Sequence, residues 1–199
     1  MKLWILRRLT WFSLRCGIYY LWSRIYQRLF ESTWLDYTKV PLFPSVGAIE
    51  DCVEKMKWRP DKWWMFWDAV SAPGAVWARY FEGKEAGDCE DVSLAAATAL
   101  REWLRHHRMH VEVTGLYLLT VPWLGRDGKV GGHSVCAISY VDVDGSKRWA
   151  HWSNWNRILW GRETVEDVVR EILRGNYSLG WALADLDLRL VRYGGWENP

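Results

Sequence analysis

The chain has 199 residues and a mass of 23.5 kDa, which suits one domain or one domain with an appendage. Charged residues make up 25% and hydrophobic residues 50% of the sequence, a balance that excludes a disordered or collagen-like chain. The net charge of +2 does not indicate a nucleic-acid partner. Tryptophan is unusually frequent at 17 residues, so the fold must bury or use a large aromatic surface.

The first 30 residues differ in charge from the rest of the chain. They contain no acidic residue and carry the basic residues Lys2, Arg7, Arg8, Arg15, Arg24 and Arg28. Apolar residues recur between these bases at helical spacing, which predicts a helix over residues 3–30. Its apolar residues cover more than one face, so we expect it to contact its own domain, another subunit or a membrane surface. The predicted division is an N-terminal helix, residues 1–35, and a domain, residues 36–199.

The same segment gives no sign of a membrane span or a signal peptide. Its longest uncharged run, Cys16 to Ser23, has eight residues, whereas a span needs roughly 20. The arginines interrupt every apolar region, which argues against a secretion signal. Four cysteines, at positions 16, 52, 89 and 136, are too far apart for a metal clip and too few for a disulfide framework. A reducing, cytoplasmic compartment is therefore expected.

Proline and tryptophan punctuate the region that follows. A short helix is predicted over residues 45–57, after Pro41 and Pro44. Residues 58–83 are rich in tryptophan and are broken by prolines, so we expect irregular structure there. They could line a glycan or peptide groove or pack into the core. The clearest helix follows at residues 88–107, with its buried stripe at Val92, Ala95, Ala96, Ala99, Leu100 and Trp103.

The second half of the chain reads mainly as strands. Strands are expected at residues 111–121, 133–141, 147–153 and 185–192, with a loop at 125–132, a hairpin at Asp144-Gly145 and a capped helix at 164–174. Helices followed by an antiparallel meander and then a helix and a strand define an α+β fold.

Cys89 is the first candidate for chemistry. It lies within Gly87-Asp88-Cys89-Glu90-Asp91, which opens the long helix. The unpaired N–H groups and positive dipole end of a helix start favour a thiolate and can stabilise an oxyanion. The three neighbouring carboxylates oppose thiolate formation, so some of them must point away from the sulfur or pair elsewhere.

His133 is the second candidate. It enters a strand after the flexible Gly131-Gly132 loop, where it can serve as the base that accepts a thiol proton. Alternation along this strand puts Cys136 on the opposite face from His133, so Cys136 is expected in the core. His106, His107 and His110 cluster at a helix end without the further ligands of a zinc site, so no metal or cofactor is expected.

These two stretches resemble the transglutaminase-like cysteine peptidases, the small bacterial and phage-encoded members of the papain-like superfamily. The similarity rests on Gly87-Asp88-Cys89-Glu90-Asp91 before an alanine- and leucine-rich helix, and on Gly132-His133-Ser134-Val135 on a strand. It covers roughly residues 45–175. It implies a papain-like core in which the cysteine helix packs on an antiparallel sheet. It also implies amide-bond chemistry by a Cys–His–Asp triad, with Cys89 as nucleophile and His133 as base.

The third triad position departs from the family pattern. Where the family has Asp followed by Asn, this chain has Ser153-Asn154. A two-residue turn at Asp144-Gly145 would put Asn154 on the face of His133, where its amide oxygen could orient the imidazole. A three-residue loop would shift the register by one and put Ser153 and His151 there instead. We favour Asn154.

The sequence thus predicts a cysteine-dependent peptidase or amidase, with acyl transfer as a variant. A peptide or isopeptide, including a cell-wall peptide, is the expected substrate class. The alternative is a weakened or inactive relative that serves an assembly such as a phage virion. The missing carboxylate and the basic N-terminal segment motivate that alternative.

Overall fold

The computed structural model describes residues 17–27, 40–58, 70–154 and 156–195 of the chain. The elements beyond the first helix are α2 (Val46–Lys55), α3 (Pro73–Phe81), α4 (Cys89–Leu104), β1 (Glu112–Leu124), β2 (Val130–Val141), β3 (Lys147–Trp152), β4 (Leu159–Arg162), α5 (Val165–Leu173), β5 (Tyr177–Ser178), β6 (Trp181–Ala184) and β7 (Leu190–Gly194). Residues 17–27 form a helix that precedes them. The fold is α+β, as the sequence predicted. No helix in the described ranges combines the length and apolar character needed to cross a bilayer.

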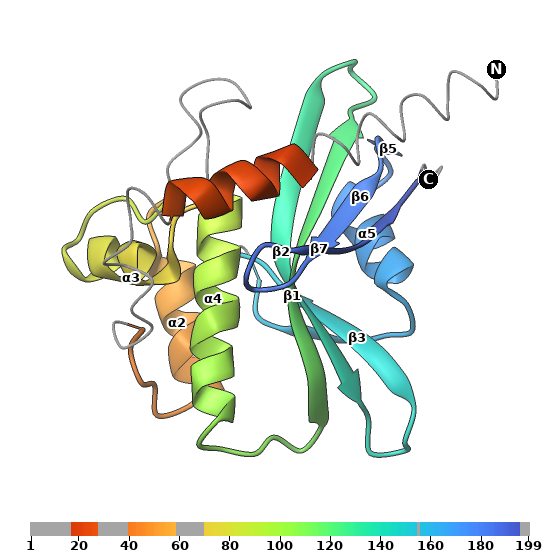
Figure 1. The fold of residues 1–199 in the computed structure, drawn as a ribbon. Coiled ribbons are helices and arrows are strands. Elements are labelled where there is room, and N and C mark those ends of the chain that lie inside the picture. The colour runs from red at the N-terminus through yellow and green to blue at the C-terminus, as the bar shows by residue number, and fades with distance from the viewer. Residues whose placement is uncertain (1–16, 28–39, 59–69, 155, 196–199) are drawn as a thin grey trace.

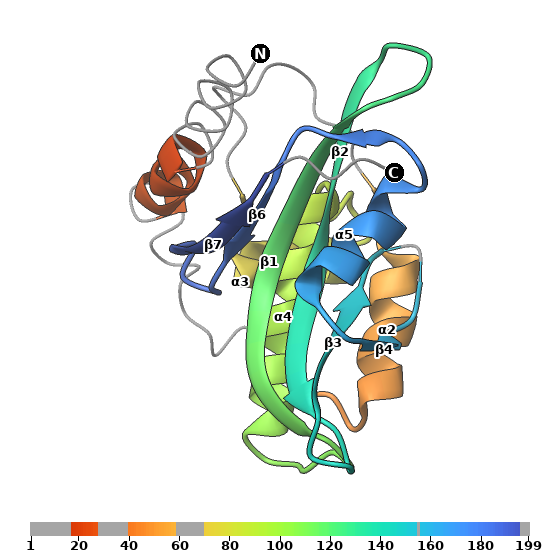
Figure 2. The same cartoon turned by 90° about the vertical axis from the view of Figure 1, so that its right-hand side faces the viewer.

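One antiparallel sheet organises the described residues. Its strands follow the order β4-β3-β2-β1-β6-β7, and β5 pairs with β1. Helices α2, α3 and α4 lie on one side of the sheet and α5 lies on the other (Figure 1). The view in Figure 2 has α5 in front of the sheet and α4 behind it. The protein is therefore layered as helices, sheet and helix.

The central helix α4 is buried on almost all sides. Its residues Val92, Leu94, Ala96 and Leu100 are at most 1% exposed, because α2 and α3 cover the side that faces away from the sheet. Alanines on this helix let neighbouring elements approach closely. The predicted stripe is buried as expected, although Trp103 at its end is only half-buried.

Alternation along β2 divides the core into two parts. Cys136 and Ile138 pack with α4 and α2 on one face, whereas Val135 and Ala137 pack with α5 on the other. The predicted core position of Cys136 is confirmed, since this side chain is fully buried. The capping box of α5 is also present, because Thr164 and Asp167 exchange hydrogen bonds at the helix start.

Two sequence expectations were wrong in the described residues. The region expected to be irregular contains α3, which starts at Pro73, a residue that suits the first turn of a helix. The strand expected at residues 185–192 is a turn at residues 185–189, and only its last residues belong to β7. The Asp185 side chain accepts the amides of Asp187 and Arg189, and its own N–H pairs with the Arg189 carbonyl. This local capping by Asp185 outweighs the alternating pattern.

Candidate functional site

The first turn of α4 leaves one amide available beside the candidate nucleophile. Asp88 caps the helix, and its carboxylate accepts the N–H groups of Glu90 and Asp91, both at 3.1 Å. The Val92 N–H bonds to the Asp88 carbonyl. The Cys89 N–H has no partner in the described part of the chain. It is therefore the amide of this turn that can donate a hydrogen bond to a ligand oxygen.

The other acids of this stretch have structural roles. Asp91 is buried, and its carboxylate accepts the backbone N–H of Ser71 at 2.5 Å and the Ser71 hydroxyl at 3.2 Å. Arg79 of α3 approaches the same carboxylate at 3.7 Å. Gly87 makes room for this contact, since a Cβ atom there would overlap the Asp91 side chain. Asp88 and Asp91 thus hold the helix start, as the sequence argument required of some acids.

Glu90 is the acid that faces the sulfur. The Cys89 thiol donates a hydrogen bond to Glu90, with Sγ and Oε2 2.9 Å apart. Burial, the Glu90 charge and this hydrogen bond together raise the pKa of the Cys89 thiol far above its usual range, and the Asp88 charge adds to the effect. A backbone hydrogen bond from Ser134 acts in the opposite direction. The resting state is therefore a protonated thiol.

His133 lies on β2 and is only 5% exposed. Burial lowers its pKa to about 4, and the nearby charges of His151 and Arg174 contribute in the same direction. The imidazole is thus neutral at pH 7, which is the form that can accept a proton. It is not preorganised as the cationic half of a thiolate–imidazolium pair.

The structure brings Cys89 next to the backbone of β2 at the position after His133. The Ser134 backbone bonds to the Cys89 sulfur, and the Ser93 hydroxyl donates to the Ser134 carbonyl at 2.9 Å. Pairing of β2 with β3 ends at Cys136 and Trp152 in the described residues. Cys89 therefore lies against the part of β2 that extends beyond β3, within one residue of His133. Alternation puts the His133 side chain on the α5 face of the strand with Val135 and Ala137, so the sulfur and the imidazole lie on opposite sides of β2.

The hairpin between β2 and β3 decides which residues share the face of His133. Asp142 and Ser146 close a three-residue loop in which Gly145 has a φ of 81°. Ala137 consequently pairs with His151. Continued alternation puts Ser153 on the face of His133 and Asn154 on the other. The two-residue turn that favoured Asn154 is wrong, because the loop is one residue longer, and the triad role of Asn154 stays a prediction.

Both candidates for the third triad position, Ser153 and Asn154, have buried atoms. Ser153 is 4% exposed. The Asn154 side-chain oxygen is buried and accepts no hydrogen bond within the described ranges. Neither supplies the carboxylate that the resemblance implies.

A polar cluster lies farther along the face of His133. His151 is 3% exposed, and its Nδ1 atom is 3.9 Å from Glu171 of α5. Glu171 in turn binds Arg162 of β4 at 2.7 Å. Burial lowers the pKa of His151, although the Glu171 charge opposes the shift. Sequence reasoning missed Glu171 and Arg162, because nothing in their local pattern shows that β4 and α5 meet here.

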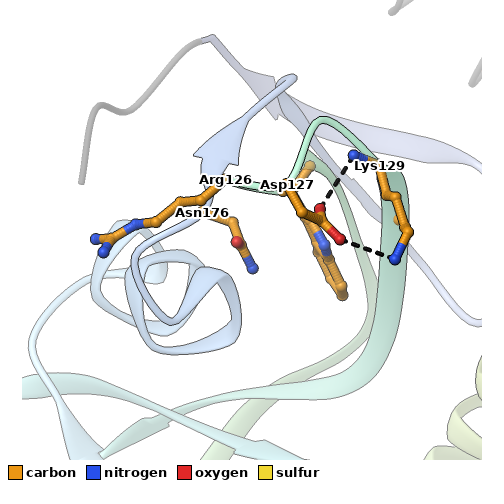
Figure 3. Close-up of a pocket in the computed structure, with 7 residues that line it drawn as sticks. Arg126, Asp127, Lys129 and Asn176 are labelled. Carbon is orange, nitrogen blue, oxygen red and sulfur yellow. Dashed lines mark hydrogen bonds and ion pairs between the residues drawn. The ribbon is translucent and has the colours of Figure 1, made fainter.

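A cavity opens at the end of the β1–β2 hairpin, and its lining includes neither Cys89 nor His133 (Figure 3). Its volume is about 430 Å³, and it is lined by Trp123, Gly125, Arg126, Asp127, Lys129, Gly131 and Asn176. Gly131 shares the strand face of His133 two residues earlier. Lys129 pairs with Asp127 at 3.0 Å, whereas Arg126, among the described residues, bonds only to the Gly175 carbonyl. The lining is therefore aromatic at Trp123 and net positive at Arg126.

The remaining predicted features fall outside the site. His107 stacks on Trp103 with ring centroids 4.6 Å apart, and the described residues contain no cluster suited to a metal ion. Trp77 is fully buried and Trp58 is 52% exposed. Cys16 and the tryptophans at 63, 64 and 67 lie outside the described residues.

Comparison with known proteins gives no relative for this chain. No protein-family model matches it, and no curated protein or solved structure does so either.

Proposed function

We propose that this protein is a cysteine-dependent amide-bond hydrolase with a transglutaminase-like, papain-like core, in which Cys89 is the nucleophile and His133 the base. The observation that carries the proposal is the position of Cys89. Its thiol lies in the first turn of a buried helix and touches the backbone of the strand that bears His133. A cysteine kept only for packing would not need this position, which a substrate carbonyl can approach because Cys89 is only partly buried.

The reaction begins with a neutral pair of groups. A substrate carbonyl oxygen binds the Cys89 N–H, and His133 accepts the thiol proton as sulfur attacks the carbonyl carbon. For this transfer the imidazole has to turn from the α5 side of β2, where alternation with Val135 places it, to the α4 side that holds Cys89. The protonated imidazole then donates this proton to the departing amine, which leaves an acyl-thioester on Cys89. Water attacks the thioester with His133 again as base, and the acid and free thiol are released. Proton transfer during attack, rather than a preformed thiolate, follows from the protonated thiol and neutral imidazole.

The cavity at the end of the β1–β2 hairpin, which includes Gly131 two residues before His133, supports a substrate class. Arg126 makes the lining net positive and Trp123 offers an aromatic surface, which together suit a peptide or isopeptide with an acidic side chain. Peptides of bacterial cell walls include this chemistry.

Two observations favour the second candidate, an inactive relative that serves an assembly such as a virion. Cys89 is bonded to a carboxylate and Ser153 replaces the expected acid. In that case the Cys89 thiol would only donate a structural hydrogen bond to Glu90. The basic N-terminal segment would attach the protein to the assembly.

Labelling with peptidyl electrophiles tests the proposal. A peptidyl vinyl sulfone with a glutamate side chain should label Cys89 faster than the partly buried Cys52, with both sites read by mass spectrometry. His133→Ala should abolish the difference, whereas His106→Ala, at an exposed histidine, should preserve it. Equal labelling of Cys89 and Cys52 in the unchanged protein would support the inactive alternative.

A second probe checks the substrate class. A vinyl sulfone with a lysine side chain should label Cys89 more slowly than the glutamate probe. Arg126→Gln should remove this preference, and Arg108→Gln, at an exposed arginine on the opposite end of the molecule's long helix, should not. If both variants keep the preference for the glutamate probe, the cavity is excluded as the recognition site.

A further inference from the structure

The helix over residues 17–27 has an inverted pattern of polarity. Its buried face carries Tyr20, Ser23 and Gln27, which are 2%, 0% and 7% exposed. Its outer face carries the aliphatic residues Ile18, Leu21 and Ile25, which are 52%, 53% and 39% exposed. A surface helix ordinarily buries its apolar stripe and exposes its polar one.

Specific hydrogen bonds hold the polar face against the domain. The Tyr20 hydroxyl bonds to the Thr120 hydroxyl at 2.9 Å. The Ser23 hydroxyl accepts the Val70 N–H at 3.1 Å, and the Gln27 amide donates to the Val70 carbonyl at 2.8 Å. These contacts fix the rotation of the helix about its axis. The outward direction of the aliphatic residues is therefore part of the fold.

The exposed side chains form one continuous stripe. Ile18, Leu21 and Ile25 are separated by three and four residues, the spacing that stacks side chains along a single helix face. We call them the aliphatic stripe. In Figure 1 this helix crosses over the end of α4 at the surface of the molecule.

We propose that the aliphatic stripe docks this protein on an anionic lipid surface. The sequence around the stripe matches such a surface, since residues 1–30 carry six bases and no acid. Each base near an anionic membrane contributes roughly 1 kcal/mol, and aliphatic residues insert at the boundary between headgroups and acyl chains. A second copy of the chain is a poorer occupant. Three half-exposed aliphatic side chains fall far short of the ~800 Å² per partner of a stable interface, and two copies of a segment with six bases and no acid repel each other.

Vesicle flotation of the full chain tests this proposal. The protein should float with vesicles of phosphatidylcholine and phosphatidylglycerol, should not float with phosphatidylcholine alone, and should dissociate as NaCl is raised. Replacing the stripe by Ile18→Ser, Leu21→Ser and Ile25→Ser should weaken binding roughly tenfold or more. A matched control replaces three exposed apolar residues elsewhere by serine, at Leu42, Val143 and Val191, and should bind like the unchanged protein.

The other outcomes overturn the proposal. Equal flotation of the stripe variant and its control, or no flotation of the unchanged protein, would exclude lipid docking by this face. A stripe variant that floats normally but changes from dimer to monomer in sedimentation would show that a second copy is the occupant. None of the replaced side chains is buried, so each variant should fold normally. Circular dichroism and a melting curve of each variant check this.

Discussion

The Cys89 thiol is hydrogen-bonded to the carboxylate of its own neighbour, Glu90, with Sγ and Oε2 2.9 Å apart. A negative charge at this distance favours the protonated thiol, whereas the start of α4 and the Ser134 backbone favour the thiolate. The carboxylate and burial prevail. Cys89 therefore occupies a helix start that favours a thiolate, but its thiol stays protonated at rest. Replacing single neighbouring side chains should change the pKa of this thiol.

Removing the Glu90 charge should make Cys89 more reactive. In Glu90→Gln, the loss of a neighbouring negative charge should lower the pKa of the thiol and raise its alkylation rate by iodoacetamide roughly tenfold at pH 7. The rate is measured by mass spectrometry of the Cys89 peptide. Glu54→Gln, which removes an exposed charge from α2, is the matched control and should change nothing. An unchanged alkylation rate in Glu90→Gln would show that burial alone raises the pKa of the Cys89 thiol.

The register of the β2–β3 hairpin can be tested with two neighbouring carboxylates. Ser153→Asp introduces an acid on the face of His133, so it should raise the pKa of that imidazole. Asn154→Asp introduces the same charge on the opposite face and should raise it much less. Titration of the histidine ring protons by NMR measures both values. A larger shift in Asn154→Asp would show that alternation does not continue beyond β3.

Protonation of His133 should destabilise the fold in acid. Folding lowers its pKa from 6.5 to about 4, so the unfolded chain binds the proton more readily between these values. The associated stability is complete above about pH 6.5 and is lost as the pH falls toward 4, by about 3 kcal/mol. Urea unfolding should show a shallower loss for His133→Gln than for His106→Gln, which changes an exposed histidine. Parallel pH profiles of the two variants would contradict this account.

Gly87 should be intolerant of a side chain. In Gly87→Ala, the new Cβ overlaps the Asp91 carboxylate, and the backbone φ of 151° disfavours an L residue. We expect a loss of about 2–4 kcal/mol and a lower Tm. Gly47→Ala is the control, since Gly47 lies in α2 and its nearest neighbour, the Ser45 hydroxyl oxygen, is at 3.8 Å. A Gly87→Ala protein as stable as Gly47→Ala would mean that the Asp91 contact is not maintained.

Local patterns predicted most of the regular elements. The alanine-rich stripe predicted α4, and the Thr164 capping box predicted α5, because these signals depend on residues close together in the sequence. The alternation of β2 placed Cys136 in the core. Proline misled the prediction at α3, where Pro73 begins a helix. Asp185 did so at the β6–β7 turn, where side-chain hydrogen bonds bend an alternating segment.

The amino-acid sequence alone determined that Cys89 opens a long helix and that His133 enters a strand, since both depend on short-range capping and alternation. It could not determine which acid faces the sulfur, which residue shares the face of His133, or which side of the N-terminal helix is buried. These depend on a one-residue difference in loop length and on contacts between segments many residues apart, such as Tyr20 with Thr120. Only the packing of the whole chain decides them, because a side chain's direction is set by the elements that surround it.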